Sequence, residues 1–568
     1  MPEIKVLPVE LRNKIAAGEV IERPASVVKE LIENSIDAGS TDIRVEVLRG
    51  GKGLVRVTDN GTGMDREDAL FCLHPHATSK LRNEEDLFHI TTMGFRGEAL
   101  PSIASVSKMK IVTGLKDSPS GRLIEVQGGE VTETRDFPAR GTSVEVRDLF
   151  FNTPARKKFL KSDGTELYHI IDSVTKEALS HEDIAFRLLT ENQETMNLSR
   201  ASGPRERITQ VYGLDFVEGL SEIHAESEGT TMTAFVTKGE NYRNSKTHQY
   251  IFINRRPVKD QTVSHALYQA YEGILPQARH PVFFLFIDMN PKKIDFNVHP
   301  AKREVRFENK DEMHRFVAGR IREALRKERT EYVTSFREIP DRPGFERPFG
   351  HNIRQMEPSA PSRYIPPMQP DRHFSEGSAL PYQASLPFIY LGDTFIAMAG
   401  KGGLTLLDHH AAHERILYEH FLKGIAPASH HLLFPKQVML SHKEYRIILE
   451  NTDLLDEMGI EVDDFGHNTL LIRSLPEALK ESDMRGILSD VAASLIEGVR
   501  PDSSLRETIA ARISCHASVR GKEILSSEEV QRLLSDLEKT EHPDQCPHGR
   551  PTRLFFSLDD LKKMFKRK

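Results

Sequence analysis

Helix-spaced and strand-like apolar runs alternate along the first part of the chain. Apolar residues recur at helical spacing over Ala25–Ile36, a segment that Pro24 opens at a favoured first-turn position and Gly39 follows. Strand-like apolar runs occupy Ile43–Leu48 and Leu54–Thr58. The pattern therefore predicts one helix followed by two strands.

Similar runs recur further along the chain. Strands are expected at Gln249–Asn254 and Val282–Asp288, with a helix over Ser264–Glu272 between them. Helix-like patterns cover Lys443–Met458 and Met484–Glu497. Strands mixed with helices indicate α+β sandwiches rather than a helical bundle.

A proline-rich stretch interrupts these patterns. Ten of the 31 prolines fall between Pro340 and Pro387. Proline lacks a backbone donor and disfavours helix in the residue before it, so an extended linker is predicted here. A long surface loop is the alternative, but a loop of this length within one compact domain is unusual. At 568 residues the chain is also too long for one core, and three or four folded units are expected.

Composition limits the environment in which the chain can work. No apolar run reaches about 18 residues, which argues against a membrane span. The segment Met1–Lys5 has no secretory pattern, and Cys72, Cys515 and Cys546 are too few for a disulfide framework. We therefore expect a reducing, cytoplasmic setting. Because the net charge is −7, any nucleic-acid contact must come from local basic patches.

Four short motifs within the first hundred residues contain groups suited to a nucleotide. Glu30 and Asn34 lie four residues apart on one helix face, where a carboxylate can polarise water and an amide oxygen can hold Mg²⁺. Asp59, in the motif Asp59-Asn-Gly-Thr-Gly63, follows a strand and can accept from an adenine amino group. Taken singly, the first pair fits a solvated helix face and the second motif fits an ordinary turn.

The remaining two motifs are Thr78-Ser-Lys80 and Gly94-Phe-Arg-Gly-Glu-Ala-Leu100. The latter is a glycine-bounded loop that runs into a predicted helix, whose first backbone N–H groups can cradle phosphates. A lone glycine-rich loop is weak evidence for a nucleotide site. The order and spacing of all four motifs are far more specific.

Three separated segments of the C-terminal part combine acidic, imidazole and thiol groups. If a helix begins near His409, then His410 and Glu414 share one face and Asp408 stands at the helix entry, which suits Zn²⁺ or Mn²⁺. Histidines on helices are more often structural or solvated, and a free cysteine is more often a buried hydrophobe. Two of the three cysteines lie beside histidines, which favours metal. The two further segments are Ser514-Cys-His516 and Gln545-Cys-Pro-His548.

The four N-terminal motifs together resemble the Bergerat fold of the GHKL ATPases. The stretches Lys14–Glu30, Gly94–Leu100 and Phe150–Arg156 further resemble the MutL family of DNA mismatch repair proteins. This resemblance implies that Glu30 is the general base of ATP hydrolysis and that Asn34 is a Mg²⁺ ligand. The other residues that it implies in ATP binding are Asp59, Gly61, Gly63, Thr78, Ser79, Lys80, Gly94, Phe95, Arg96, Gly97, Thr142 and Lys302.

By the same resemblance, Asp59 reads the adenine with help from Thr142, and Gly94 to Gly97 form a lid over the nucleotide. Lys302 would reach the γ-phosphate from a second subdomain, where a point positive charge can link hydrolysis to subdomain movement. The family leads us to expect that ATP orders the lid and brings two N-terminal halves together.

The C-terminal segments resemble those of the endonuclease-type members of this family. The resemblance implies metal-dependent nicking of DNA with Zn²⁺ or Mn²⁺, and places Asp408 and Glu414 in the catalytic site. His409 departs from the usual glutamine of the motif, and Ser514 departs from the usual alanine. The implied ligands are Asp408, His410, Glu414, Cys515, Cys546 and His548.

The resemblance also implies a domain organisation. Residues 1–205 would form the GHKL ATPase domain, 206–332 a ribosomal S5-like transducer domain, and 333–384 the flexible linker. Residues 385–568 would form an α+β dimerisation and endonuclease domain, with a regulatory insertion at about 435–495.

The expected partners are double-stranded DNA bound without sequence preference, the mismatch sensor MutS, a sliding clamp and a second copy of the chain. The nearest match to a clamp-binding motif is His430-His-Leu-Leu-Phe-Pro435, which lacks the usual glutamine. Basic clusters are often merely solvated, but those that could contact phosphates give salt-sensitive binding. The candidate residues are Arg156, Lys157, Lys158, Lys161, Arg255, Arg256 and Lys259.

Two alternatives to an ATP-switched nicking enzyme stay open. One is an ATP-dependent matchmaker, a scaffold whose zinc is structural and whose DNA is nicked by another protein. The other is a different ATPase of the same superfamily. A heat-shock chaperone would lack the Cys-x-His segments, a histidine kinase would need a phosphoacceptor helix, and a type II topoisomerase would need a tyrosine nucleophile domain.

Overall fold

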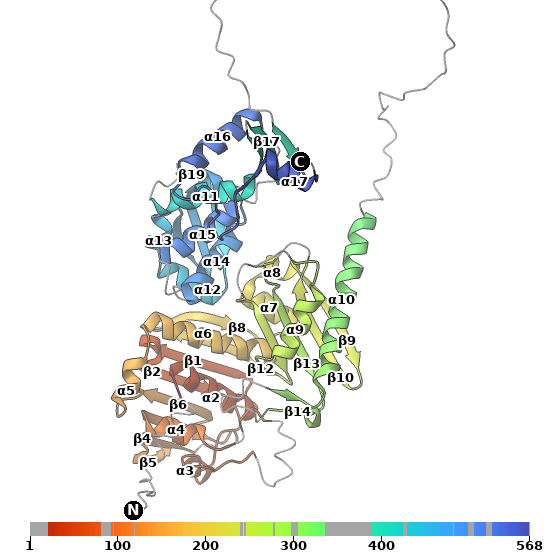
Figure 1. Cartoon of the computed structure of the whole chain (residues 1–568). Coiled ribbons are helices and arrows are strands. Elements are labelled where there is room, and N and C mark those ends of the chain that lie inside the picture. The colour runs from red at the N-terminus through yellow and green to blue at the C-terminus, as the bar shows by residue number, and fades with distance from the viewer. Residues whose placement is uncertain are drawn as a thin grey trace, which may run out of the picture.

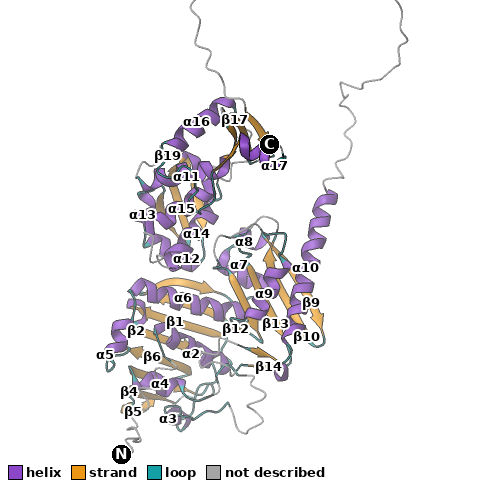
Figure 2. Cartoon of the chain, viewed as in Figure 1, coloured by secondary structure: helices purple, strands orange, loops and turns teal. Residues whose placement is uncertain are grey.

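The computed structural model describes residues 21–80, 92–94, 96–118, 120–238, 242–243, 246–275, 279–296, 305–335, 388–392, 394–400, 402–423, 429–480, 482–497, 505–517 and 525–566. Helices and strands are mixed throughout these ranges, as Figure 2 shows, so the predicted α+β class is confirmed. The predicted linker, 333–384, lies outside the described residues beyond Ser335 and stays a prediction.

Eight strands form the large N-terminal sheet (Figure 1). Their order across the sheet is β5-β4-β3-β6-β2-β1-β7-β8, and all neighbours are antiparallel except β1 and β7. The strands are β1 (Asp42–Leu48), β2 (Leu54–Asp59), β3 (Lys108–Gly114), β4 (Gly121–Gln127), β5 (Glu130–Phe137), β6 (Gly141–Arg147), β7 (Ala185–Thr190) and β8 (Gln193–Leu198).

Two long helices, α2 (Pro24–Asp37) and α6 (Asp163–Ser180), pack against each other beside this sheet. The buried stripe of α2 includes Val27, Val28 and Leu31 at helical spacing, which confirms the predicted helix. Both predicted strands that follow it are also present, as β1 and β2. The short helices of this part are η1 (Arg49–Gly51), α3 (Asp68–Phe71), α4 (Ala99–Ser105) and α5 (Pro154–Phe159).

A second sheet has the order β12-β11-β13-β10-β9, with β11 parallel to β13. It confirms both strands and the helix predicted between residues 249 and 288. Its strands are β9 (Leu220–Ser227), β10 (Thr230–Thr237), β11 (Gln249–Ile253), β12 (Arg256–Val258) and β13 (Phe283–Asp288). The other elements of this part are α7 (Pro204–Tyr212), α8 (Leu214–Glu218), α9 (Gln261–Ala270), η3 (Pro291–Lys293), β14 (Ile294–Asp295), β15 (Arg306–Phe307) and α10 (Lys310–Ser335).

The two N-terminal sheets share a hydrophobic core. Tyr250, Phe252 and Phe284 of the second sheet belong to the same buried cluster as Val45 and Val57 of the first. The hydrophobic core therefore includes residues from both sides of the boundary predicted between residues 205 and 206. That domain boundary stays a prediction.

The C-terminal part contains a four-stranded sheet of order β16-β17-β18-β22. Helix α11 (His409–Leu422) follows β18 directly and begins where the sequence predicts, with Asp408 as its N-cap. The strands are β16 (Phe388–Leu391), β17 (Phe395–Gly400), β18 (Gly403–Asp408) and β22 (Arg553–Ser557), and the flanking helices are α16 (Ser527–Glu538) and α17 (Leu558–Met564).

Between these strands in the sequence lies a second C-terminal layer, which we call the lobe and define as residues 429–517. Its sheet has the order β19-β21-β20, and its helices share one buried cluster with α11. The elements are β19 (Ser429–Met439), α12 (His442–Leu449), α13 (Thr452–Asp456), β20 (Glu461–Gly466), β21 (Thr469–Pro476), η4 (Glu477–Leu479), α14 (Met484–Glu497) and α15 (Leu505–Ala517).

One predicted helix is wrong in its continuity. The structure divides Lys443–Met458 into α12 and α13, because Asn451 adopts a non-helical backbone conformation with φ −133° and ψ 29°. The helix predicted over Met484–Glu497 is present as α14. Among the helices of the described ranges, none is both long enough and apolar enough to cross a membrane.

Candidate functional site

The carboxylate of Asp59, the predicted adenine contact, lies at the end of β2. Its Oδ2 accepts from the Ser35 hydroxyl at 2.9 Å, and its Oδ1 accepts from the Gly61 backbone N–H at 2.9 Å. Burial raises the pKa of Asp59, and these hydrogen bonds oppose that shift. Thr142 pairs with Asp59 across the strands and contacts the Thr113 hydroxyl at 3.0 Å. The sequence did not single out Ser35 or Thr113.

The glycines after Asp59 allow the chain to pass close to other backbone. A Cβ on Gly61 would lie 2.8 Å from the carbonyl oxygen of Ala38, and one on Gly63 would lie 2.1 Å from that of Gly114. Gly63 also has φ +70°, a conformation that disfavours any side chain. These glycines are therefore required by contacts within the protein itself, in addition to any contact with a base.

Glu30 and Asn34 share one face of α2, as predicted, and Asn34 faces a cation. The Lys80 ammonium donates to Asn34 Oδ1 at 2.8 Å and pairs with Asp37 Oδ2 at 2.6 Å. An amide oxygen and a carboxylate oxygen that together hold an ammonium form a donor set that suits Mg²⁺. The residues present therefore fit the ion that the sequence predicts, and Asp37 is a candidate to which the sequence assigned no role.

Asp37 also holds the start of the predicted lid. Its carboxylate accepts from the backbone N–H of Met93 at 2.7 Å and of Gly94 at 2.9 Å. Gly97 has φ +63°, and its carbonyl accepts from the His76 N–H at 3.1 Å. The lid is thus tied to α2 at one end and to the segment before Thr78 at the other.

The remaining predicted nucleotide contacts differ in how the structure places them. Thr78 accepts from the Lys80 backbone N–H at 3.2 Å, Ser79 is exposed, and Arg96 is half-buried. Phe95 and Lys302 lie outside the described residues.

A buried charged cluster lies behind Glu30, between α2 and α6. The Lys29 ammonium donates to Glu33 at 2.5 Å and lies 3.6 Å from Glu30 Oε1. Glu177 of α6 is 1% exposed, and burial together with the neighbouring Glu33 raises its pKa to about 8. At neutral pH a proton on Glu177 therefore replaces a charge that the cluster could not balance.

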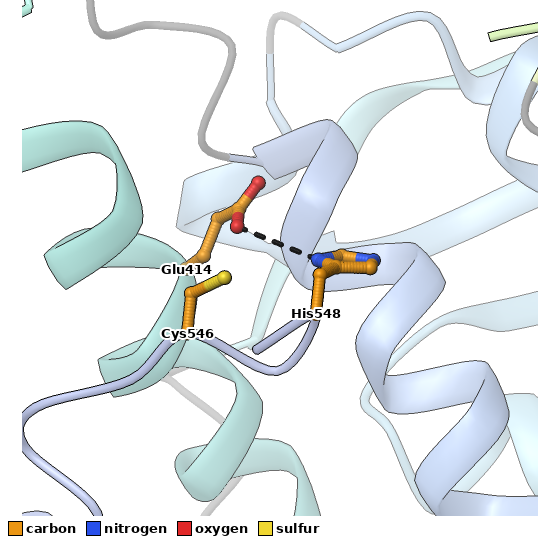
Figure 3. Close-up of side chains that lie close together, drawn as sticks. All are labelled: Glu414, Cys546 and His548. Atoms are coloured by element: carbon orange, nitrogen blue, oxygen red, sulfur yellow. Dashed lines mark ion pairs between the residues drawn. The ribbon is translucent and has the colours of Figure 1, made fainter. Parts of the chain in front are cut away.

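The second site joins α11 to the loop before β22. Ligand atoms of Glu414, Cys546 and His548 all lie within 4.8 Å of one another. Figure 3 shows Glu414 projecting from α11 toward the two loop residues. His410, one helical turn before Glu414, places its Nε2 3.6 Å from the Glu414 carboxylate. One carboxylate, imidazoles and a thiol at this spacing fit Zn²⁺.

Charge within this group is balanced by histidine. Burial opposes ionisation of Glu414, but a hydrogen bond from His548 and the nearby charge of His410 lower its pKa overall. The hydrogen bonds of His548 with Cys546 and then with Glu414 raise the His548 pKa to about 9. A divalent ion bound here would replace that proton, because a ligating imidazole must be neutral.

Backbone and side-chain contacts hold the loop in place. The Cys546 N–H donates to the Arg550 carbonyl at 2.8 Å, and Gly549 closes the turn with φ +81°. The Arg415 side chain donates to the Gln545 carbonyl at 2.5 Å. Glu419 accepts from the backbone N–H groups of residues 541 and 542. Two residues of α11 thus fix the loop beside Glu414.

The structure gathers only part of the predicted ligand set. The Cys515 thiol interacts with Glu414, and burial followed by that carboxylate raises the Cys515 pKa to about 11. Asp408 is not in the compact group, because its Oδ1 caps α11 by accepting from the Ala411 N–H at 2.9 Å. The prediction of Asp408 as a metal ligand stays untested.

The predicted basic residues divide into exposed and buried groups. Lys157 and Lys158 of α5 are exposed, as are Lys161 and Lys259, and Arg156 is half-buried. Arg255 pairs with Asp183 at 3.0 Å. Arg256 is 5% exposed, donates to the Thr92 carbonyl and stacks on Phe296, so its prediction as a phosphate contact is wrong.

Comparisons with known proteins match three segments of the chain to family models and the whole chain to relatives. Family models match residues 21–138 ("Histidine kinase-, DNA gyrase B-, and HSP90-like ATPase"), 208–326 ("DNA mismatch repair protein, C-terminal domain") and 389–525 ("MutL C terminal dimerisation domain"). A protein named DNA mismatch repair protein MutL from Thermodesulfovibrio yellowstonii is 40% identical, with all of both chains covered. Its namesake from Geotalea daltonii is 38% identical over 99% of each chain.

Solved structures also match the N-terminal part. The ATPase domain of Aquifex aeolicus MutL complexed with ADP is 34% identical, covering 48% of this chain and 94% of that one, with a TM-score of 0.37. The N-terminal domain of a DNA repair protein is 25% identical, covering 56% of this chain and 99% of that one, with a TM-score of 0.49.

We predict that Gly63→Ala weakens nucleotide binding by at least about tenfold, because its Cβ would displace the Gly114 backbone beneath the adenine position. Titration with a fluorescent ATP analogue measures the loss. Gly229→Ala is the matched control, since Gly229 has φ +77° but no neighbour within 4 Å of its Cβ. Equal affinity of Gly63→Ala and wild type would contradict the prediction.

We further predict that Glu177→Gln removes a pH-dependent loss of stability. Folding raises the Glu177 pKa, so the protonated carboxyl stabilises the folded protein. This contribution to the free energy of unfolding is complete below about pH 4.5 and is lost as the pH rises to about 8. Between about pH 5.5 and about pH 7.5, wild type should lose up to about 2 kcal/mol more unfolding free energy than the variant. Urea unfolding followed by circular dichroism measures this difference. Exposed Glu194→Gln should behave like wild type, and an unchanged pH slope in Glu177→Gln would refute the assignment.

Proposed function

Because the chain belongs to the MutL family of DNA mismatch repair proteins, and has a GHKL-type ATPase domain and a C-terminal dimerisation domain, we propose that it is an ATP-driven switch that licenses metal-dependent nicking of DNA. The observation that supports the nicking step is the group formed by Glu414, Cys546 and His548. Two segments distant in the sequence, α11 and the loop before β22, converge there on one potential ion.

The ATPase part of this proposal assigns roles to residues of α2. Glu30 orients and deprotonates the water that attacks the γ-phosphate, and Asn34 with Asp37 holds Mg²⁺ once Lys80 has moved to a phosphate. Asp59 accepts from the adenine amino group, in a position fixed by Ser35 and Gly61. Asp37 also binds the backbone of Met93 and Gly94. Movement of Lys80 away from Asp37 would therefore change the charge balance of the carboxylate that holds the start of the lid.

The nuclease part assigns the ion to α11 and the loop before β22. Glu414 and His548 would bind it with Cys546, and His410 and Cys515 lie against the same carboxylate. A bound Zn²⁺ or Mn²⁺ would supply a hydroxide at neutral pH and stabilise charge on the phosphate. Arg415 and Glu419 would keep the loop residues in place, since they bind the loop backbone.

The alternative is a matchmaker whose ion is structural and which nicks no DNA itself. Cysteine and histidine in the group favour this reading, because closed structural zinc sites use the same donors. Both functions include a bound metal ion, but only the nuclease cleaves DNA. A DNA cleavage assay therefore separates them.

Dimerisation is assigned to the outer face of the four-stranded C-terminal sheet. The partners Ile389, Ala397, Leu406 and Leu554 form one row across the four strands. Ile389 and Leu554 are exposed, and Leu391 and Phe395 extend the apolar face as a neighbouring exposed pair. An apolar sheet face of this kind suits an isologous contact with a second copy.

DNA and a sliding clamp are assigned to two other surfaces. The exposed lysines of α5 and Lys161 would contact phosphates without reading sequence. Leu433 and Phe434 of β19 are 88% and 82% exposed, and lie where the register of β19 against β21 is interrupted between His431 and Lys436. Two large apolar side chains on such a bulge suit a hydrophobic pocket of a partner.

The decisive experiment combines full-length protein, supercoiled plasmid and Mn²⁺. We expect wild type to nick the plasmid and Glu414→Gln to lose on the order of 100-fold of that activity, with ATP hydrolysis unchanged. Asp408→Asn retains an N-cap for α11 and separately tests a role of Asp408 in nicking. Glu528→Gln, exposed on α16, is the control for loss of a carboxylate.

If wild type nicks no plasmid with any divalent metal, even with clamp and mismatch sensor present, the matchmaker function is supported and the nuclease proposal is refuted. Nicking that survives Glu414→Gln would place the chemistry elsewhere.

We also predict that Leu433→Ala with Phe434→Ala lowers affinity for the sliding clamp by at least about tenfold, because both side chains would be buried in the complex. Isothermal titration calorimetry with purified clamp measures the change. Phe465→Ala removes another exposed aromatic of the lobe and should bind like wild type. Unaltered affinity of the double variant would show that the clamp binds elsewhere.

A further inference from the structure

Helix α12 of the lobe lies against α6 of the ATPase domain (Figure 1). The two helices are separated by more than 260 residues of chain, yet the Lys443 ammonium and the Asp172 carboxylate form a 2.6 Å ion pair. Lys443 is only 12% exposed and also lies 4.6 Å from the centre of the Tyr168 ring. An ammonium removed from water needs such partners, and both of these come from α6.

A second buried contact, between a carboxylate and an imidazole, lies beside this ion pair. The carboxylate of Glu444 is 3.3 Å from His248 Nε2, a residue immediately before β11. Within the lobe, Glu444 forms a capping box with Ser441 and also accepts from the Ser489 hydroxyl. Contacts within the lobe, from α12 and α14, therefore fix the orientation of the Glu444 carboxylate toward His248.

Arginines extend the contact on both sides. The Arg485 side chain of α14 donates to the Tyr212 carbonyl and lies 5.2 Å from the centre of the Phe216 ring. On the other side, Arg279 donates to the Cys515 sulfur at 3.7 Å. The contact therefore runs from α6 to the edge of the Glu414 group.

The pKa values of the two buried carboxylates, Asp172 and Glu444, are both lowered, as expected for a specific interface. Burial opposes the charge on Asp172, but Lys443 and Lys176 hold its pKa well below the ordinary value. Burial likewise opposes the charge on Glu444, which His248 and two serines keep ionised by lowering its pKa. Charges that stay ionised while buried depend on exact partners, unlike a chance contact of solvated side chains.

We propose that the lobe docks onto the ATPase domain of its own chain through the Lys443–Asp172 ion pair and the Glu444–His248 contact, with α12 packed on α6. The lobe of the same chain is the occupant of this surface, because Lys443 meets the opposite charge of Asp172 and Glu444 meets the imidazole of His248. This docking goes beyond the proposed nicking activity and does not depend on it.

Helix α6 gives the docking a route to the ATP site. Asp172 and Glu177 lie five residues apart and so project about 140° apart around the helix. Asp172 faces Lys443, whereas Glu177 faces the Lys29 cluster beside Glu30. One rigid element thus contacts both the lobe and the helix that holds the predicted general base.

A disulfide trap tests the docking in the full-length protein. A Cβ on Gly164 of α6 would lie 2.4 Å from the Glu450 carboxylate, which directly follows α12. Gly164→Cys with Glu450→Cys places one thiol on each side of this contact. Oxidised glutathione, which accepts the two electrons and is released as two thiols, should join them in a disulfide. A specific protease site inserted within residues 336–387 then allows the two halves to be separated.

Docking predicts that the cleaved halves stay joined at the mass of one chain until reductant is added, and that neither single-cysteine variant does so. Adding Lys443→Glu should slow the trap at least about tenfold, since it places like charge against Asp172. Lys539→Glu is the matched charge change at an exposed lysine directly after α16 and should trap at the original rate.

No trapping above the single-cysteine controls, trapping only at the mass of two chains, or equal rates with Lys443→Glu would each overturn the docking. ATP hydrolysis and the dimer mass of the Lys443→Glu protein verify that both halves remain folded. Plasmid nicking is scored separately, so loss of nicking and loss of docking are distinguishable.

Discussion

A carboxylate taken out of water must be matched by a positive charge or by a proton, and the internal organisation of this protein depends on that constraint. Glu414 is matched by two histidines, Asp172 by two lysines, and Glu177 by its own proton. In each of the first two cases one matching group, His548 or Lys443, comes from a segment far away in the sequence. Folding of α11 with its loop, and contact of the lobe with α6, are therefore each required to keep a charge satisfied.

The same constraint connects the ATP site to the rest of the chain. Asp37 holds Lys80 together with the backbone of the lid, so a nucleotide phosphate that attracts Lys80 would also release one of the charges fixing the lid. Behind this site, Lys29 shares its environment with Glu30 and with Glu177 of α6. Under the proposed function, a change at the γ-phosphate would reach α6 through these neighbouring charged groups.

Sequence alone predicted the local helices and strands better than the contacts between them. Proline at the start of α2 and the apolar runs of β1 and β2 are local features, and they were predicted nearly to the residue. The break at Asn451 is not, because the pattern over Lys443–Met458 stays helical and the kink reflects packing of α12 and α13 in the lobe. Nor does spacing reveal that Arg256 is buried against Phe296, since an exposed and a buried arginine look alike in sequence.

The ligand set illustrates the same limit. Cysteine and histidine stood out in the sequence because they are rare and adjacent, and Glu414, Cys546 and His548 do converge. Asp408 has two uses that spacing cannot separate, since an aspartate at a helix start can cap the helix or bind an ion, and here it caps. The exposure of the side chains around Glu414 favours a catalytic ion over a structural one. His410 and His548 are 31% and 38% exposed, whereas Glu414 is 5% exposed. An ion held from the buried side and open on the histidine side could accept a phosphate, which a closed structural zinc site could not.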